Sequence, residues 1–151
     1  MNKILLWFRI IRPQTLFASL IPVLVGIRSV LVSGTAMAVE RPVMIAGLTA
    51  VCALGLQILS NLINDYYDYR RGTDKKGRAG FRRALAEGEV TERQMLTAWV
   101  ITLGVCVLTG LYLVWVGGWV ILLIGATALL FAWLYTATSK SLSYLGIADI
   151  F

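Results

Sequence analysis

The chain has 151 residues, of which 58% are hydrophobic and only 15% carry a charge, and it contains no histidine. A typical soluble domain has about 25% charged residues, so the composition excludes an ordinary soluble domain and indicates an integral membrane protein. The net charge of +6 then reports on orientation and on lipid headgroups, and not on nucleic acid binding. The absence of histidine excludes a histidine-based metal site and a histidine general base.

The N-terminal part of the chain is predicted to approach the membrane and then cross it. Residues 1–12 mix basic side chains with leucine, tryptophan and phenylalanine, which is typical of an amphipathic segment at the headgroups. Pro13 is well suited to open a helix, and residues 13–32 form the first predicted span. A cleaved signal peptide ending near residues 36–38 is the alternative, but arginines on both sides of the apolar part disfavour it.

The second span is followed by a long charged segment. Residues 42–63 contain no charged side chain, which is long enough to cross a bilayer, and the predicted span is 42–67. Residues 65–93 contain eight basic and six acidic side chains. Near the end of this segment, Thr91 and Gln94 have the spacing of a capping box, so a helix is expected to start there.

The C-terminal third predicts two more spans. Residues 94–139 form an uncharged run of 46 residues, about twice the length of one span. The glycine pair 117–118 predicts a tight turn between spans at 94–116 and 119–138, and residues 144–151 resemble the opening of a fifth. The fold class is therefore an all-α, polytopic transmembrane helix bundle with about four complete spans plus the start of a fifth. Cys52 and Cys106 lie in apolar runs and are predicted to be core residues without a disulfide.

The distribution of basic residues predicts the orientation. Twelve of the fourteen lie on the side of the 65–93 segment. By the positive-inside rule this segment is cytoplasmic and residues 33–41 lie on the opposite side. The sequence therefore predicts a multi-pass protein of the cell inner (cytoplasmic) membrane.

A cluster of acidic and amide side chains stands where the second span ends. The polar positions recur with helical spacing at Gln57, Asn61, Asn64 and Asp68. This spacing places them on one helical face, with Asp65 beside them. Asn61, one turn further into the membrane, is expected to orient a ligand or to pair with a neighbouring helix.

The charge of this cluster points to a bound cation. Acidic groups at a helix C-terminus face the negative end of the helix dipole, and the carboxylates also repel one another. A hard divalent cation with oxygen ligands offsets both effects, and Mg²⁺ is the expected ion. The predicted metal ligands are Asn64, Asp65, Asp68 and Asp74. A solvated acidic loop is the alternative interpretation.

Three arginines follow the acidic cluster within ten residues of Asp74: Arg78, Arg82 and Arg83. Magnesium is usually held by carboxylates together with phosphate oxygens, and the arginine fork suits phosphate. With an apolar helix bundle behind the site, the pattern suits a lipid diphosphate substrate. Contact with lipid headgroups is the alternative, especially for Arg82.

Residues 64–69, with the sequence Asn-Asp-Tyr-Tyr-Asp-Tyr, are followed by Gly72 and Asp74. This stretch resembles the first aspartate-rich motif of the UbiA superfamily of aromatic prenyltransferases. Its form most resembles the group that acts on 1,4-dihydroxy-2-naphthoate in menaquinone synthesis. Weaker agreement with that group is found at residues 12–16, 22–26, 80–84, 135–136 and 142–146.

The resemblance implies transfer of a polyprenyl group from a prenyl diphosphate to an aromatic acceptor, with magnesium as cofactor. It implies catalytic roles for Asn64, Asp68 and Asp74. It also implies that the diphosphate is bound by Arg78, Arg83 and Lys140. The ring faces of Tyr66 or Tyr67 then stabilise an allylic cation, with packing as the alternative.

The resemblance also bears on the extent of the chain. The family fold has nine membrane helices and a second acidic motif in its later half. Residues 1–151 resemble only the N-terminal part of that single domain, so the expectation is that they are inactive alone. The protein partners are unknown.

Several alternatives stay open. The family usually has proline where Phe81 stands and glutamate where Asp149 stands, so another aromatic acceptor is possible. A CDP-alcohol phosphotransferase also uses spaced aspartates, but it has glycine soon after the second aspartate, where this chain has Tyr69 and Arg70. A non-enzymatic membrane subunit or half-transporter is the third alternative. The lack of ionisable groups in residues 94–139 counts against a transporter.

Overall fold

The computed structural model describes residues 2–34, 40–73 and 83–136, with side chains described as far as Phe131. The described residues form helices and connecting turns, with no strand among them. The helices are α1 (Lys3–Ile11), α2 (Pro13–Val32), α3 (Pro42–Arg70), α4 (Glu92–Gly117) and α5 (Trp119–Thr136). This confirms the all-α fold class.

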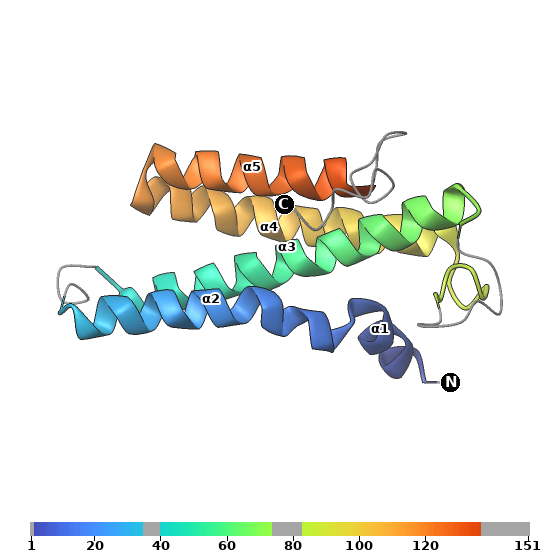
Figure 1. Cartoon of the computed structure of the whole chain (residues 1–151), viewed down its shortest axis with the longest axis horizontal. Helices are drawn as coiled ribbons and strands as arrows, with labels where there is room; N and C mark the ends of the chain where they lie inside the picture. The colour runs from blue at the N-terminus through green and yellow to red at the C-terminus, as the bar shows by residue number, and fades with distance from the viewer. Residues whose placement is uncertain (1, 35–39, 74–82, 137–151) are drawn as a thin grey trace.

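The four long helices run lengthwise beside one another, and α1 lies across one end of the bundle (Figure 1). Helix α3 is central, because it packs against α2, α4 and α5 and also contacts α1. The N-terminus of α4 and the C-terminus of α3 lie at the same end as α1. This end therefore collects most of the described charged residues that flank the uncharged spans.

Three helices, α2, α3 and α4, are long and apolar enough to cross a membrane, and the apolar part of α5 over Trp119–Phe131 is shorter. Helix α2 has the predicted limits, whereas α3 extends three residues beyond the predicted end at residue 67, to Arg70. The membrane helix bundle is thus confirmed for the described residues. The predicted fifth span at 144–151 lies outside them.

Local sequence signals explain where the helices begin and end. Pro13 occupies the first turn of α2, where its missing N–H costs nothing. Thr91 accepts a hydrogen bond from the Gln94 backbone N–H, and the Gln94 side chain accepts one from the Thr91 backbone N–H, so the capping box at the start of α4 is confirmed. Gly118 has φ +79° between α4 and α5, a conformation that glycine adopts without a steric penalty.

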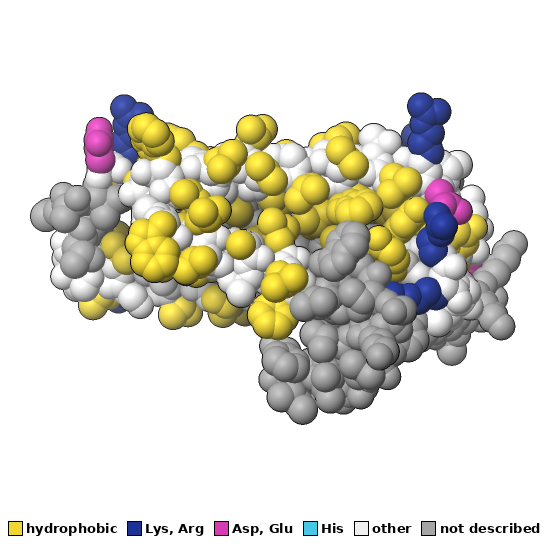
Figure 2. All heavy atoms as spheres, turned by 90° about the horizontal axis from the view of Figure 1, so that it is seen from above, with side chains coloured by type: hydrophobic (Ala, Val, Ile, Leu, Met, Phe, Trp, Pro, Cys, Tyr) yellow, Lys and Arg dark blue, Asp and Glu magenta, His cyan; other side chains and the backbone are white. Residues whose placement is uncertain are grey.

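Apolar side chains cover the outer surface of the long helices. Figure 2 shows hydrophobic side chains spread along one face, with described charged side chains only near the two ends. None of the residues in the apolar window of α2 is buried within the bundle. Contact with lipid explains such a large apolar surface. A helix in a bilayer is apolar both on the side that faces lipid and on the side that packs against other helices.

The largest cluster of buried apolar side chains lies at the charged end of the bundle. It joins α1, the last third of α3, the segment 84–90 and the start of α4, through Ile10, Leu62, Ala84, Leu85, Val90 and Met95. Leu6 and Trp7 of α1 pack against this cluster, while Ile4, Leu5 and Phe8 stay exposed on its other side. The predicted amphipathic N-terminal segment is therefore a helix that is anchored by one of its faces.

Helices α3 and α4 approach each other closely at a small residue. Gly55 is buried, and a Cβ atom added there would lie 2.6 Å from the Sγ atom of Cys106. One turn away, Cys52 Sγ lies 3.9 Å from the carbonyl oxygen of Cys106. Both cysteines are free thiols, as predicted. Small residues at such contacts let the backbones of membrane helices approach each other.

We predict that Gly55→Ala destabilises the protein by about 1–3 kcal/mol, the usual cost of overpacking. The short side chain of Cys106 is buried and has one torsion, so it cannot swing far from the new methyl group. Thermal unfolding in detergent micelles measures the effect.

Gly47→Ala is the matched control, because Gly47 is on the same helix and a Cβ atom there would meet nothing within 4 Å. The double variant Gly55→Ala/Cys106→Ala should recover most of the lost stability, since it removes the Sγ atom. Equal stability of Gly55→Ala and Gly47→Ala would contradict the close contact.

Candidate functional site

The last turns of α3 carry the acidic motif, and they divide it between two environments. Asp65 is buried, with 3% of its surface exposed, whereas Asn64 and Asp68 are half-buried. Residues four apart lie on one strip of a helix and adjacent residues do not. Asn64 and Asp68 therefore share a strip, and Asp65 lies on the neighbouring strip together with Asn61.

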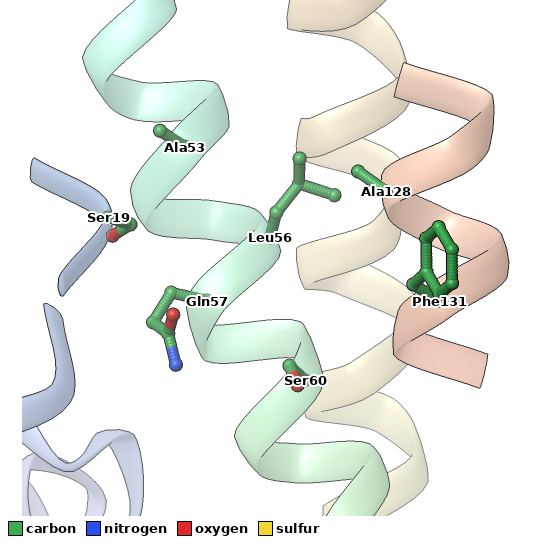
Figure 3. Close-up of a pocket in the computed structure, with 7 residues that line it drawn as sticks. All are labelled: Ser19, Ala53, Leu56, Gln57, Ser60, Ala128 and Phe131. Carbon is green, nitrogen blue, oxygen red and sulfur yellow. The ribbon is translucent and has the colours of Figure 1, made fainter. Parts of the chain in front are cut away.

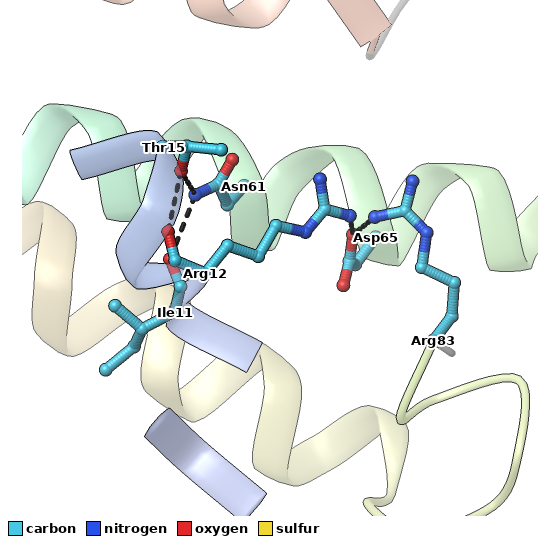
Figure 4. A network of polar contacts seen from close by, with 6 residues as sticks. All are labelled: Ile11, Arg12, Thr15, Asn61, Asp65 and Arg83. Atoms are coloured by element: carbon cyan, nitrogen blue, oxygen red, sulfur yellow. Dashed lines mark hydrogen bonds and ion pairs between the residues drawn. The ribbon is translucent and has the colours of Figure 1, made fainter. Parts of the chain in front are cut away.

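The buried carboxylate of Asp65 is held by two arginines from distant parts of the chain (Figure 4). Nη2 of Arg12 donates a hydrogen bond of 2.6 Å to its Oδ1. Nη1 of Arg83 donates to the same oxygen. Removing one partner of such a buried pair typically costs about 3–5 kcal/mol, because a charge is left uncompensated.

Asn61 fixes the corner between α1 and α2. Its Nδ2 atom donates to the Ile11 carbonyl at 3.0 Å and to Thr15 Oγ1 at 2.9 Å. Thr15 Oγ1 in turn donates to the Arg12 carbonyl at 2.9 Å. At this corner Arg12 has a left-handed backbone with φ 56°, which costs of order 1–3 kcal/mol for a residue other than glycine. Pairing of Asn61 with a neighbouring element, one of its two predicted roles, is confirmed.

A second ion pair attaches α1 to the segment after the acidic motif. Arg9 of α1 pairs with Glu89, which follows the Gly88 turn. The Nε atom of Arg9 is buried without a hydrogen-bond partner in the described part of the chain. The apolar cluster packs the segment from Ala84 to Val90 over the end of α3, and this ion pair adds one contact to α1.

The tyrosines of the motif are packed against neighbouring side chains. The Tyr66 and Tyr67 rings meet edge to face, with centroids 5.4 Å apart. Tyr66 also lies 6.4 Å from the Trp99 ring of α4, and the Arg70 guanidinium stands 5.9 Å from the Tyr66 centroid. These contacts agree with packing as the role of Tyr66. Stabilisation of an allylic cation by its ring stays a prediction.

A cavity of about 390 Å³ lies between α2, α3 and α5 (Figure 3). Its wall consists of Ser19, Ala53, Leu56, Gln57, Ser60, Ala128 and Phe131. Ser60 lies on the same strip of α3 as Asn64 and Asp68, at spacings of four, and Gln57 lies one turn before Ser60. The cavity therefore opens along the face of α3 that leads to the half-buried part of the acidic motif.

The donors in the described residues can be compared with the needs of a metal ion. No group of three or more acidic, cysteine or histidine side chains that could hold a metal occurs among them. Asn64 and Asp68 supply an amide oxygen and a carboxylate from one strip. This fits Mg²⁺, which takes few protein ligands and completes its shell with water and phosphate oxygens. Asp74, Arg78 and Lys140 lie outside the described residues.

Comparison with known proteins identifies the family. A model of the UbiA prenyltransferase family matches residues 19–151. The chain belongs to this family. The CDP-alcohol phosphotransferase alternative is thereby set aside. No solved structure gives a significant match to this UbiA family chain.

The curated relatives of this UbiA chain share one printed name, 1,4-dihydroxy-2-naphthoate octaprenyltransferase. The protein from Mycobacterium leprae (strain TN) is 37% identical over 145 residues, covering 95% of this chain and 47% of the relative. The Escherichia coli (strain K12) protein is 33% identical over 153 residues, with the same coverage. The Bacillus subtilis (strain 168) protein is 29% identical over 147 residues. The chain therefore spans about half the length of the curated relatives it matches.

Sequence reasoning found the acidic motif but missed the partner of its buried member. The sequence predicts contact with lipid headgroups for Arg12 and a place in a weak family resemblance, but no contact with Asp65. Ser19 and Phe131 lie on either side of the cavity. The sequence does not predict this, because a single serine or phenylalanine is common within an apolar span.

We predict that Asn61→Ala destabilises the α1–α2 corner by about 1–3 kcal/mol, because the Ile11 carbonyl and the strained Arg12 backbone lose their support. Hydrogen exchange of residues 3–16 should speed up. Ser60→Ala is the control, since the Ser60 hydroxyl makes no hydrogen bond with the described residues. Unchanged exchange at the corner in Asn61→Ala would show that the apolar cluster alone holds it.

Proposed function

We propose that this chain is part of an enzyme that transfers a polyprenyl group from a prenyl diphosphate to 1,4-dihydroxy-2-naphthoate in menaquinone biosynthesis. The names of its relatives support this acceptor and an octaprenyl donor. The observation that carries the proposal is the strip of α3 that joins Ser60, at the cavity, to Asn64 and Asp68. It places a largely apolar cavity and an acidic end on one face, as a lipid diphosphate requires.

The acidic end is proposed to bind the diphosphate through magnesium. Asn64, Asp68 and Asp74 would hold the ion, with Arg78, Arg83 and Lys140 on the diphosphate. Bound Mg²⁺ supplies stabilisation of the negative charge that develops on the leaving diphosphate. Because the arginine fork matches phosphate oxygens, Arg83 orients the leaving group towards the end of α3.

The cavity is proposed to hold the organic part of the reaction. Its lining is largely apolar, which suits the hydrocarbon chain of a prenyl donor. The Gln57 amide and the Ser60 hydroxyl make no hydrogen bond with the described residues and face the cavity. These groups suit the hydroxyl groups of an aromatic acceptor, because polar groups at membrane depth are costly when they stay unpaired.

Asp68→Ala is expected to reduce prenyl transfer by about a thousandfold. Loss of a magnesium ligand removes several kcal/mol of charge stabilisation, and each 1.36 kcal/mol is about tenfold in rate. The assay uses residues 1–151 joined to the part of the Mycobacterium leprae relative outside the match. It supplies octaprenyl diphosphate, dihydroxynaphthoate and Mg²⁺, and it quantifies the prenylated product.

Glu89→Ala is the control, because Glu89 is a carboxylate of the same region that pairs with Arg9 and has no proposed role in the reaction. Chelation should stop turnover of the unsubstituted fusion, and added Mg²⁺ should restore it. A correctly folded fusion without any product would refute the proposed function. Full activity of Asp68→Ala at saturating Mg²⁺ would refute the metal site.

The charged end of the bundle is proposed to face the cytoplasm across the inner membrane, since twelve of fourteen basic residues lie on that side. In a variant without Cys52 and Cys106, Glu92→Cys should react with an impermeant maleimide only after the cells are opened. Ser33→Cys should react in intact cells. Both positions are exposed. The reverse pattern would contradict this orientation.

A further inference from the structure

Asp65 stands apart from the rest of the acidic motif in its contacts. It is 3% exposed, and the side chains of its partners Arg12 and Arg83 are each 17% exposed. Both arginines approach the same oxygen, Oδ1. A carboxylate so enclosed by two guanidinium groups is poorly placed to bind a metal ion, because a cation would be repelled by both.

The partners of Asp65 come from two separate parts of the chain. Arg12 stands at the corner between α1 and α2, and Arg83 begins the segment that packs over the end of α3 through the apolar cluster. Asn64 precedes Asp65, and Asp68 is three residues further on. On a helix, the Cβ atoms of residues three apart, such as Asp65 and Asp68, lie about 5–6 Å from each other. The two guanidinium groups are thus held beside the strip that carries Asn64 and Asp68.

We propose that Asp65 is a positioning residue, whose carboxylate orients Arg12 and Arg83 towards a diphosphate group bound beside Asn64 and Asp68. It does not ligate the metal. The inference rests on the proposed function, because it takes the anion to be the diphosphate of a prenyl donor.

Charge and geometry support this role. The guanidinium groups of Arg12 and Arg83 and the carboxylate of Asp65 together carry one net positive charge, which attracts an anion. A guanidinium has five N–H donors in a rigid fork, and each arginine contacts Oδ1 through one terminal nitrogen. The ion pair therefore fixes the direction of each fork through one of its five donors. Arginines fixed in this way lose little conformational entropy when the diphosphate binds.

The test measures binding of geranyl diphosphate to the purified chain in lipid nanodiscs by calorimetry, as a function of Mg²⁺ concentration. Asp65→Asn should weaken the affinity for geranyl diphosphate by about tenfold, the loss expected for one charge-assisted contact. The Mg²⁺ concentration at half saturation should stay unchanged. Asp68→Asn should instead raise that concentration by about tenfold or more.

Trypsin gives a second reading that needs no substrate. Cleavage after Arg83 should be slow in the unsubstituted chain, because the side chain is held on Asp65, and faster in Asp65→Asn. Cleavage after Arg93, on α4, reports unfolding of the bundle and should not change. Glu89→Gln is the matched control, since it removes another carboxylate that pairs with an arginine at this end of the bundle. It should leave the geranyl diphosphate affinity unchanged.

Arg83→Gln keeps the test decisive if Asp65→Asn does not fold. It should weaken the affinity for geranyl diphosphate and leave the Mg²⁺ concentration at half saturation unchanged. In the Asp65→Asn background, Arg83→Gln should reduce this affinity by a smaller factor than it does in the unsubstituted chain. Unchanged affinity in Arg83→Gln would overturn the inference.

The remaining outcomes separate the inference from the proposed function. If Asp65→Asn raises the Mg²⁺ requirement as Asp68→Asn does, Asp65 is a metal ligand and the inference fails while the proposed function stands. Equal or tighter geranyl diphosphate binding by Asp65→Asn also overturns it. If the unsubstituted chain binds no geranyl diphosphate at any Mg²⁺ concentration, the proposed function loses its support and the inference falls with it. A trypsin difference would then mark a purely structural ion pair.

Discussion

The carboxylate of Asp65 lies in the interior of a membrane protein, where an unpaired charge is too costly to persist. Its two arginine partners come from the α1–α2 corner and from the segment that follows the acidic motif. Among the described residues, this charge is compensated where three separate parts of the chain meet at the end of α3. This requirement places α1 and the segment from Arg83 onward against the bundle, and with them the apolar cluster around Met95.

Specific packing is concentrated at this end because the rest of the bundle faces lipid. Along the spans an outward leucine and an inward leucine have similar environments, so apolar burial gives little drive for helix association. Close contacts at small residues, such as Gly55 against Cys106, serve instead. At the charged end, water is available as the alternative solvent, and burial of Leu62, Leu85 and Val90 there contributes the usual hydrophobic stabilisation.

Helical periodicity gives α3 two neighbouring strips of polar side chains with different contacts. Asn61 and Asp65, four residues apart, turn towards the α1–α2 corner and make structural contacts. Gln57 and Ser60 turn towards the cavity between α2 and α5. Asn64 and Asp68 continue that second strip. A compact motif of adjacent polar residues thus separates into a buried part, which joins distant segments of the chain, and a half-buried part beside it.

The sequence by itself determined the spans, their ends and the family motif, because these depend on local properties. An uncharged run of sufficient length predicts a membrane helix, and Pro13, the Thr91–Gln94 capping box and Gly118 mark helix ends within a few residues of themselves. The sequence also placed the acidic motif, and it allowed two roles for Asn61. Only the tertiary structure decided between those roles, and only it separated Asp65 from Asn64 and Asp68. The partners of Asp65 are 53 and 18 residues away, and the cavity is assembled from three helices. Such contacts depend on how helices pack, which no local pattern encodes.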